Sequence, residues 1–153
     1  MTNGDGDRIF LDTNVLVYAN VAESPLHQGA LRAIETRYNA GVELSISRQV
    51  LREYLATFSR PQRFMNPRPI ATVVERVRFF QKRFRVVEDG PHVTERLLTL
   101  MQQIPIGGKQ VHDANIVATM LGHGIPALLT HNTDDFARFS GFITVLPLAT
   151  STP

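Results

Sequence analysis

The chain has 153 residues, of which 43% are hydrophobic and 20% charged, the size and composition of a single folded domain. It contains no cysteine, which excludes disulfides and thiolate metal sites. No stretch approaches the roughly 20 apolar residues of a membrane-spanning helix, and residues 1–7 are too polar for a signal peptide. We therefore expect a cytoplasmic protein without a membrane partner.

The basic residues are unevenly distributed, although the net charge is only +2. Fourteen of the sixteen are arginine, and nine of these lie between Arg48 and Arg85, where only Glu53 and Glu75 oppose them. Arginine binds phosphate with two parallel hydrogen bonds and stacks on bases, so this stretch favours nucleic-acid binding. A solvated helix face or a partner interface is the alternative interpretation.

An apolar run at residues 9–11 ends in Asp12, Thr13 and Asn14, and an amphipathic segment follows at residues 15–21. This pattern is typical of a buried strand that leads into a short helix. Ligand sites of open α/β sheets form beyond the carboxyl ends of the strands. We therefore predict that Asp12 is a site carboxylate held by Thr13 and Asn14. The alternative is that the three residues only cap the helix.

A second helix is predicted to begin with Ser24 as its N-cap and Pro25 at its first position, and to end at Gly41. Residues 42–46 alternate between apolar and polar side chains, which indicates a strand. Ser47 is expected to cap the helix that follows this strand.

Glu53 lies one turn into that third helix, where a glutamate is usually solvated. If the strands are parallel, however, Glu53 lies at the same edge of the sheet as Asp12. The chain then continues with a proline-rich loop at 60–69, a helix at 70–84, a strand at 85–88 and a helix at 91–103.

The last third of the chain contains two further polar positions beside predicted elements. A helix begins near Gln110 and carries Asp113 in its first turn, where the helix dipole favours an ionised carboxylate. Asp113 is either a site residue or only a stabiliser of this helix. An apolar strand at 127–129 ends in a polar cluster, and a final strand is predicted at 142–145. The cluster contains Thr130, Asn132, Asp134 and Asp135.

The alternation of strands and helices predicts an α/β fold with a mostly parallel sheet and helices on both faces. We assign one domain to residues 8–148, with short tails at 1–7 and 149–153. Carboxylates that converge at one sheet edge repel one another unless a cation is bound, and oxygen-rich sites take Mg²⁺ or Mn²⁺. Together with the arginines, such a site favours phosphodiester hydrolysis.

The motifs resemble those of the PIN-domain ribonucleases, and most closely the VapC-type toxins of bacterial toxin–antitoxin pairs. The matching segments cover nearly the whole chain. They are residues 9–14 (IFLDTN), Glu53 after the second strand, residues 111–114 (VHDA) with 116–118, and residues 128–136 (LLTHNTDDF) followed by 139–142. The resemblance implies a three-layer α/β/α sandwich and a Mg²⁺-dependent endoribonuclease acting on single-stranded RNA. It also implies a homodimer and a cognate antitoxin.

By this resemblance, Asp12 and Asp113 hold Mg²⁺ (or Mn²⁺), and Glu53 ligates the ion or orients the attacking water. The fourth acidic position is open, because many family members have aspartate where this chain has Asn132. Asp134 is our candidate for that catalytic position.

Besides Asn14, four side chains remain as possible supports of the site. Asp135 could replace Asp134, or Asn132 could itself be the fourth ligand. Thr13 or Thr130 is expected to position a ligand by a hydrogen bond.

The loop at 60–69 carries Arg60, Arg63 and Arg68, with Phe64 among them. The arginines suit RNA phosphates and the aromatic ring suits an unstacked base. An antitoxin would instead use Phe64 as an apolar anchor with arginine at the rim. We predict that the two uses overlap.

Two other functions remain open from the sequence. The asparagine at 132 and the arginine excess would also fit a non-catalytic RNA-binding or adaptor module on the same fold. A phosphotransfer domain fits less well, because it needs a lysine after a strand, and Lys82 and Lys109 do not follow one.

Overall fold

The computed structural model describes residues 7–60 and 68–148. Its centre is a five-stranded parallel sheet in the order β3-β2-β1-β4-β5, which confirms the predicted parallel α/β fold. The strands are β1 (Arg8–Leu11), β2 (Glu43–Ser47), β3 (Arg85–Val87), β4 (Ala127–Leu129) and β5 (Thr144–Leu146).

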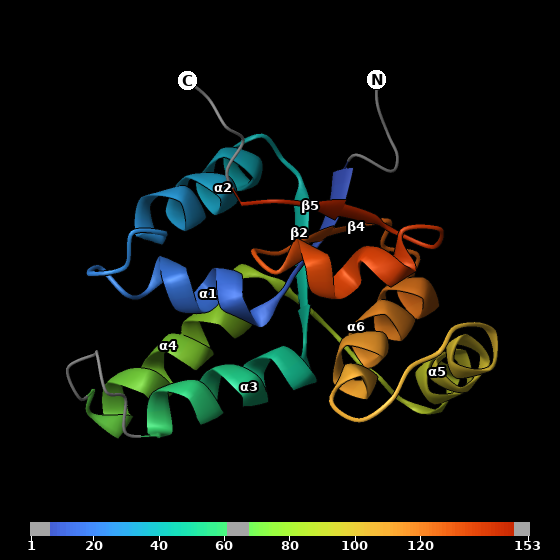
Figure 1. Cartoon of the computed structure of the whole chain (residues 1–153). Helices are drawn as coiled ribbons and strands as arrows, with labels where there is room; N and C mark the ends of the chain where they lie inside the picture. The colour runs from blue at the N-terminus through green and yellow to red at the C-terminus, as the bar shows by residue number, and fades with distance from the viewer. Residues whose placement is uncertain (1–6, 61–67, 149–153) are drawn as a thin grey trace.

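The helices form a layer on each side of the sheet (Figure 1). The first layer holds α1 (Thr13–Ala19), α2 (His27–Asn39), α3 (Arg48–Ser59) and α4 (Ile70–Arg83). The second layer holds α5 (Pro91–Gln103) and α6 (Gln110–His123), which pack against each other. The strand order reverses after β3, and since crossovers between parallel strands are right-handed, the later helices fall on the opposite face. The predicted three-layer arrangement is therefore confirmed.

The central strands β1 and β4 form the middle of the hydrophobic core. Phe10, Leu11, Leu128 and Leu129 are fully buried. A strand covered by helices on both faces has no solvated side, which is why these segments have unbroken apolar sequences rather than alternating ones.

The direction in which the chain adds strands to the sheet reverses between β1 and β4. The chain leaves β1 for β2 on one side, whereas β4 pairs with β1 on the other side. Asp12 directly follows β1 and Thr130 directly follows β4, and the Asp12 amide donates to the Leu129 carbonyl at 3.0 Å. This point of reversal is where open α/β sheets form their ligand sites.

Two predicted helix caps are wrong in detail. Helix α2 begins at His27 rather than at Pro25, and the Ser24 hydroxyl accepts from the Leu26 amide (3.0 Å) in the preceding turn. Ser47 does occupy the N-cap position of α3, but its side chain makes no capping bond. The hydroxyl of Ser47 is buried without a hydrogen-bond partner. For α3, the sequence therefore predicts which residue stands at the N-cap position, but not whether its side chain makes a capping hydrogen bond.

A short 3₁₀ helix, η2 (Thr133–Phe139), was not predicted from the sequence. It buries Phe136 and Phe139 and delays the last strand, which begins at Thr144 rather than at residue 142. In a 3₁₀ helix, side chains three residues apart lie on the same face, so these two aromatic rings both point into the core.

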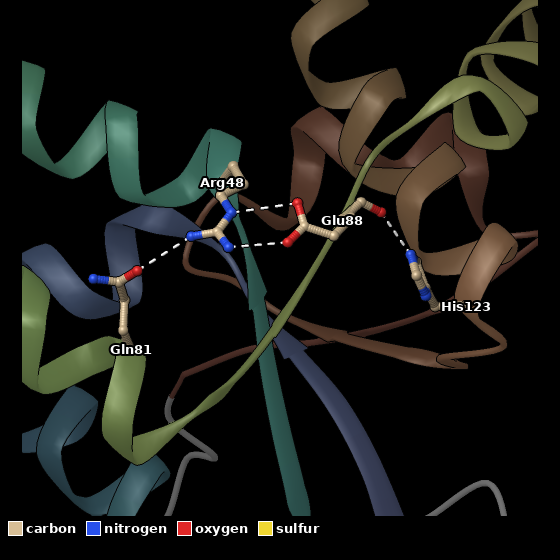
Figure 2. A network of polar contacts seen from close by, with 4 residues as sticks. All are labelled: Arg48, Gln81, Glu88 and His123. Atoms are coloured by element: carbon tan, nitrogen blue, oxygen red, sulfur yellow. Dashed lines mark hydrogen bonds and ion pairs between the residues drawn. The ribbon is translucent and has the colours of Figure 1, made fainter.

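The arginine-rich stretch is partly neutralised by acids that lie outside it in the sequence. Figure 2 shows the Arg48 guanidinium forked on Glu88 (2.9 and 3.3 Å) and also donating to Gln81 Oε1 at 3.1 Å. The Glu88 carbonyl accepts from His123 Nε2 at 2.6 Å. Arg85 pairs with Glu43 at 2.7 Å. The arginines are thus less available for nucleic acid than the sequence suggests.

Within residues 7–60 and 68–148, no helix has the length and apolar character needed to cross a bilayer.

Candidate active site

Asp12 is a buried carboxylate, 7% exposed, that accepts hydrogen bonds at both of its oxygens. Its Oδ1 accepts from the Thr13 amide (2.8 Å), and its Oδ2 accepts from Thr130 Oγ1 (2.8 Å) and Asn14 Nδ2 (3.0 Å). Burial raises the pKa of Asp12 to about 6, helped by the charge of Glu53, while these hydrogen bonds pull it down. A cation beside Asp12 would offset the cost of keeping it ionised.

Thr130 and Asn14 connect the ends of β1 and β4 around Asp12. Thr130 Oγ1 accepts from Asn14 Nδ2 (3.1 Å) and from the Asn132 amide (3.0 Å). Asn14 Oδ1 accepts from the His131 amide (3.0 Å). These bonds fix the orientation of Asp12, so the supporting residues expected from the sequence do surround it.

Glu53 lies on α3 and is held by two neutral donors. Thr13 Oγ1 donates to its Oε1 at 2.6 Å, and Gln49 Nε2 donates to its Oε2 at 3.0 Å. In the part of the chain that the structure describes, no basic side chain makes an ion pair with Asp12, Glu53 or Asp113. The three carboxylates are therefore not neutralised by a basic side chain of the described segments, and their negative charge favours binding of a cationic ligand.

Asp113 occupies the first turn of α6 and is partly exposed. Burial, and then the charges of Asp12, Asp135 and Glu53, raise the pKa of Asp113 to about 6, with His112 acting in the opposite direction. The sequence suggested that the helix dipole would favour the ionised form. Burial and the three neighbouring carboxylates act against this dipole.

One pocket of about 320 Å³ brings most of these residues together. It is lined by Asp12, Thr13, Asn14, Val17, Tyr18, Glu53, Thr57, Asp113 and Asn132. Thr130 is buried behind Asp12. Asp134 and Asp135 are exposed on η2 and do not line the pocket, although the charge of Asp135 affects Asp113. Among the candidates for the fourth position, only Asn132 lies at the pocket.

Sequence analysis missed Gln49 and Tyr18. Gln49 is 7% exposed and contacts Glu53, and its position four residues before Glu53 on one helix could have indicated this contact. Tyr18 lines the pocket, and its ring meets that of His131 edge-on at 5.5 Å. No pattern in the sequence singles out this aromatic pair.

The pocket fits a hard divalent cation in the chemistry of its donors. Its carboxylates lack basic partners among the described residues, and burial together with the neighbouring carboxylates raises the pKa of both Asp12 and Asp113. No three His, Asp or Glu side chains of the described segments lie close enough together to hold a metal ion among themselves. Mg²⁺, however, commonly keeps several waters and uses only one or two carboxylates.

The arginine loop is only partly described. Arg60 is exposed at the end of α3, and the Arg68 guanidinium lies 4.7 Å over the ring of Phe58. Arg63 and Phe64 lie outside the described residues. The predicted overlap of an RNA surface and a partner surface at this loop therefore stays a prediction.

Comparison with known proteins identifies the family. The sequence matches the PIN domain family over residues 9–141. Comparison with curated proteins gives no match.

Several solved structures share the fold. One is the Mycobacterium tuberculosis toxin VapC20, described as cleaving the sarcin–ricin loop, with a TM-score of 0.69 and 22% identity, covering 91% of this chain and 99% of that one. DNA-bound VapBC from Salmonella typhimurium has a TM-score of 0.69 and 18% identity, covering 93% and 98%. A toxin–antitoxin complex from Klebsiella pneumoniae has a TM-score of 0.66 and 22% identity, covering 94% and 99%.

At these identities the structural likeness establishes the fold alone, but the sequence match spans most of the chain. By that match, the chain belongs to the PIN domain family.

Proposed function

We propose that this chain is an endoribonuclease that requires Mg²⁺ or Mn²⁺ and acts as the toxin of a VapBC-type toxin–antitoxin pair. The observation that carries the proposal is the pocket at the end of β1, where Asp12, Glu53 and Asp113 meet without a basic partner among the described residues. The PIN family match and the VapC-like fold support it.

In this proposal Asp12 and Asp113 hold the cation, and Asn132 completes the site from the end of β4. When bound, the cation supplies charge stabilisation to the phosphate under attack. Glu53 orients a water molecule and accepts its proton, because Thr13 and Gln49 hold its carboxylate in place while each of its oxygens retains a lone pair. Asp134 stays an alternative to Asn132 only if η2 moves toward the pocket.

RNA is the proposed substrate for two reasons. The chain carries a large excess of arginine over lysine, and arginine suits phosphate recognition. One structure of the same fold is described as a toxin that cleaves the sarcin–ricin loop. Mapping of the cleavage sites on RNA would identify the target of this chain.

A cognate antitoxin is the proposed protein partner, because several structures of this fold are toxin–antitoxin complexes. The described surface offers a pocket of about 280 Å³ between α1, α2 and α4. Leu16, Ile34 and Phe80 contribute apolar side chains to its lining, and Arg76 and Arg83 contribute positive charge. This composition fits an acidic segment with an apolar anchor, and we place the antitoxin here as well as at the loop of Arg60, Arg63, Phe64 and Arg68.

The decisive experiment is cleavage of single-stranded RNA by the purified chain, followed by gel electrophoresis. We expect Mg²⁺- or Mn²⁺-dependent products that disappear in EDTA and in the Asp12→Asn variant. Full activity of that variant, or full activity in EDTA, contradicts the mechanism.

A non-catalytic RNA-binding module is the second candidate function. It is favoured by Asn132 at the pocket and by the absence, within the described segments, of three side chains grouped closely enough for a metal. In that case RNA binding weakens steeply with salt, and added Mg²⁺ produces no cleavage products.

A further inference from the structure

Gln49 is a buried amide whose hydrogen-bonding groups are directed at the candidate active site. It lies on α3, is 7% exposed, and is one turn from Glu53. Its Nε2 donates to Glu53 Oε2 (3.0 Å) and to the carbonyl of His112 (2.9 Å). Its Oε1 accepts from Asn115 Nδ2 at 2.8 Å.

These contacts permit only one orientation of the amide. A flipped amide would direct its oxygen at the Glu53 carboxylate and the His112 carbonyl, and its NH₂ group at the NH₂ group of Asn115. All three contacts would then be repulsive. The side chain is therefore held rigidly, and its own bonds transmit that rigidity to its neighbours.

The bond to His112 connects Glu53 with Asp113. His112 directly precedes Asp113 in the first turn of α6, so Gln49 joins the helix that carries Glu53 to the helix that carries Asp113. Asn115 extends the connection to Asp89 at the end of β3, at 3.3 Å. Thr13 makes the corresponding connection from Glu53 toward Asp12.

Gln49 is uncharged, and this preserves the negative charge of the pocket. A lysine or arginine at this place would make an ion pair with Glu53 and cancel part of the negative charge of the pocket. An amide donates to the carboxylate without neutralising it, so Glu53 is oriented and the charge that attracts a cation is kept.

We propose that Gln49 is a positioning residue that fixes Glu53 of α3 relative to Asp113 of α6 and so adjusts the pocket to a divalent cation. The inference rests on the proposed function. Gln49 does not line the pocket, and it acts through the two carboxylates.

The test measures Mn²⁺ binding by titration calorimetry and RNA cleavage by the full chain. Gln49→Met keeps the length of the side chain and removes all three hydrogen bonds. Gln49→Asn keeps a polar amide that is too short to span Glu53 and His112, and it serves if the first variant folds poorly. The matched control is Gln81→Met, since Gln81 is exposed, does not line the pocket and accepts a hydrogen bond from Arg48 (Figure 2).

We expect both Gln49 variants to bind Mn²⁺ at least about tenfold more weakly, as is typical when a residue behind a metal ligand is removed. We also expect kcat to fall while KM for RNA changes little, and the control to match the wild type. In a Glu53→Gln background, Gln49→Met should cause a smaller further loss of Mn²⁺ affinity, because one of the two carboxylates through which it acts is already altered.

Unchanged Mn²⁺ affinity in both Gln49 variants overturns the positioning role and leaves the proposed nuclease intact. An equally large loss in the Glu53→Gln background also overturns it, because it indicates general damage to the fold. A wild-type chain that neither binds Mn²⁺ nor cleaves RNA overturns the proposed function, and the positioning role with it.

Discussion

Thr13 Oγ1 donates to Glu53 Oε1 at 2.6 Å, so the residue that follows Asp12 also holds the carboxylate of α3. The backbone amide of the same residue donates to Asp12 Oδ1 at 2.8 Å. Thr13 thus serves two carboxylates from one position, with its amide for one and its hydroxyl for the other.

Replacing Thr13 by valine removes the hydroxyl and keeps the shape and the amide. Hydrogen bonds to charged groups contribute about 1.5–3 kcal/mol, so we expect RNA cleavage to fall at least about tenfold. Single-turnover cleavage at saturating Mg²⁺ measures this. The control is Thr99→Val on α5, whose hydroxyl bonds only the exposed carbonyl of Glu95. Equal rates for the two variants would show that the bond to Glu53 has no role.

Thr130→Val should destabilise the protein in a way that depends on pH. Thr130 Oγ1 donates to buried Asp12 and lowers its pKa, so its removal raises the pKa of Asp12 above its value of about 6. An unpaired buried group costs about 1–3 kcal/mol, and this cost is full where Asp12 is ionised. It shrinks as the pH falls through the folded-state pKa and Asp12 becomes protonated. Urea unfolding of wild type and variant at pH 7.5 and pH 5 tests this, and an equal difference at both pH values contradicts it.

Asp113→Asn should stabilise the protein without metal near neutral pH. The folded-state pKa of Asp113, about 6, lies above the ordinary aspartate value of 3.8, so the ionised form is disfavoured in the folded state. Wild-type stability should therefore rise as the pH falls from about 6 toward 4, where only the folded state takes up the proton. Because Asp113 is partly exposed, water reduces the effect, and we expect a gain in the midpoint of only about 3 °C at pH 7.5. Thermal scans with and without Mg²⁺ measure it.

The thermal scans with Mg²⁺ separate the stabilisation by a bound cation from the effect of Asp113 protonation. Added Mg²⁺ should raise the midpoint of the wild type and have a smaller effect on Asp113→Asn, because one proposed ligand is gone. A variant that is less stable than the wild type at pH 7.5 would show that Asp113 stabilises α6, as the dipole argument first suggested.

Arg83→Glu should weaken antitoxin binding without affecting RNA cleavage. The Arg83 guanidinium lies 3.8 Å over the ring of Tyr38 beside the pocket between α1, α2 and α4, and the charge reversal would repel an acidic segment. We expect at least about a tenfold loss of affinity in a binding assay with the cognate antitoxin. Lys82→Glu on the same helix is the control, since Lys82 is exposed and does not line the pocket. Equal losses in both variants would indicate general electrostatic attraction instead of this pocket.

The fold was largely predictable because every strand and most of the helices have a local signal. Unbroken apolar runs predicted β1 and β4, and the polar residues after them predicted where the pocket lies. Whether Glu53 faced water or the pocket depended on the packing of α3 against α1, which its own helix does not encode. The folded structure shows that Glu53 faces the pocket, because Thr13, 40 residues earlier in the sequence, donates a hydrogen bond to its carboxylate.

The remaining errors have related causes. The role of Gln49 depends on His112 and Asn115, which lie more than 60 residues away in the sequence. The pKa of Asp113 depends on burial and on three carboxylates from other elements, which an argument from its own helix does not include. Helix η2 was missed because its two buried phenylalanines follow a polar cluster that resembles a loop.

The hydrogen bond between Thr130 and Asp12 joins residues 118 positions apart. During synthesis, a chain that has not yet reached β4 has no neighbour on that side of β1 and no hydroxyl for Asp12. Contacts of such long sequence separation form late in folding. The pocket is therefore assembled only when almost the whole domain has emerged from the ribosome, and an unfinished or truncated copy of the proposed nuclease would be inert toward the RNA around it.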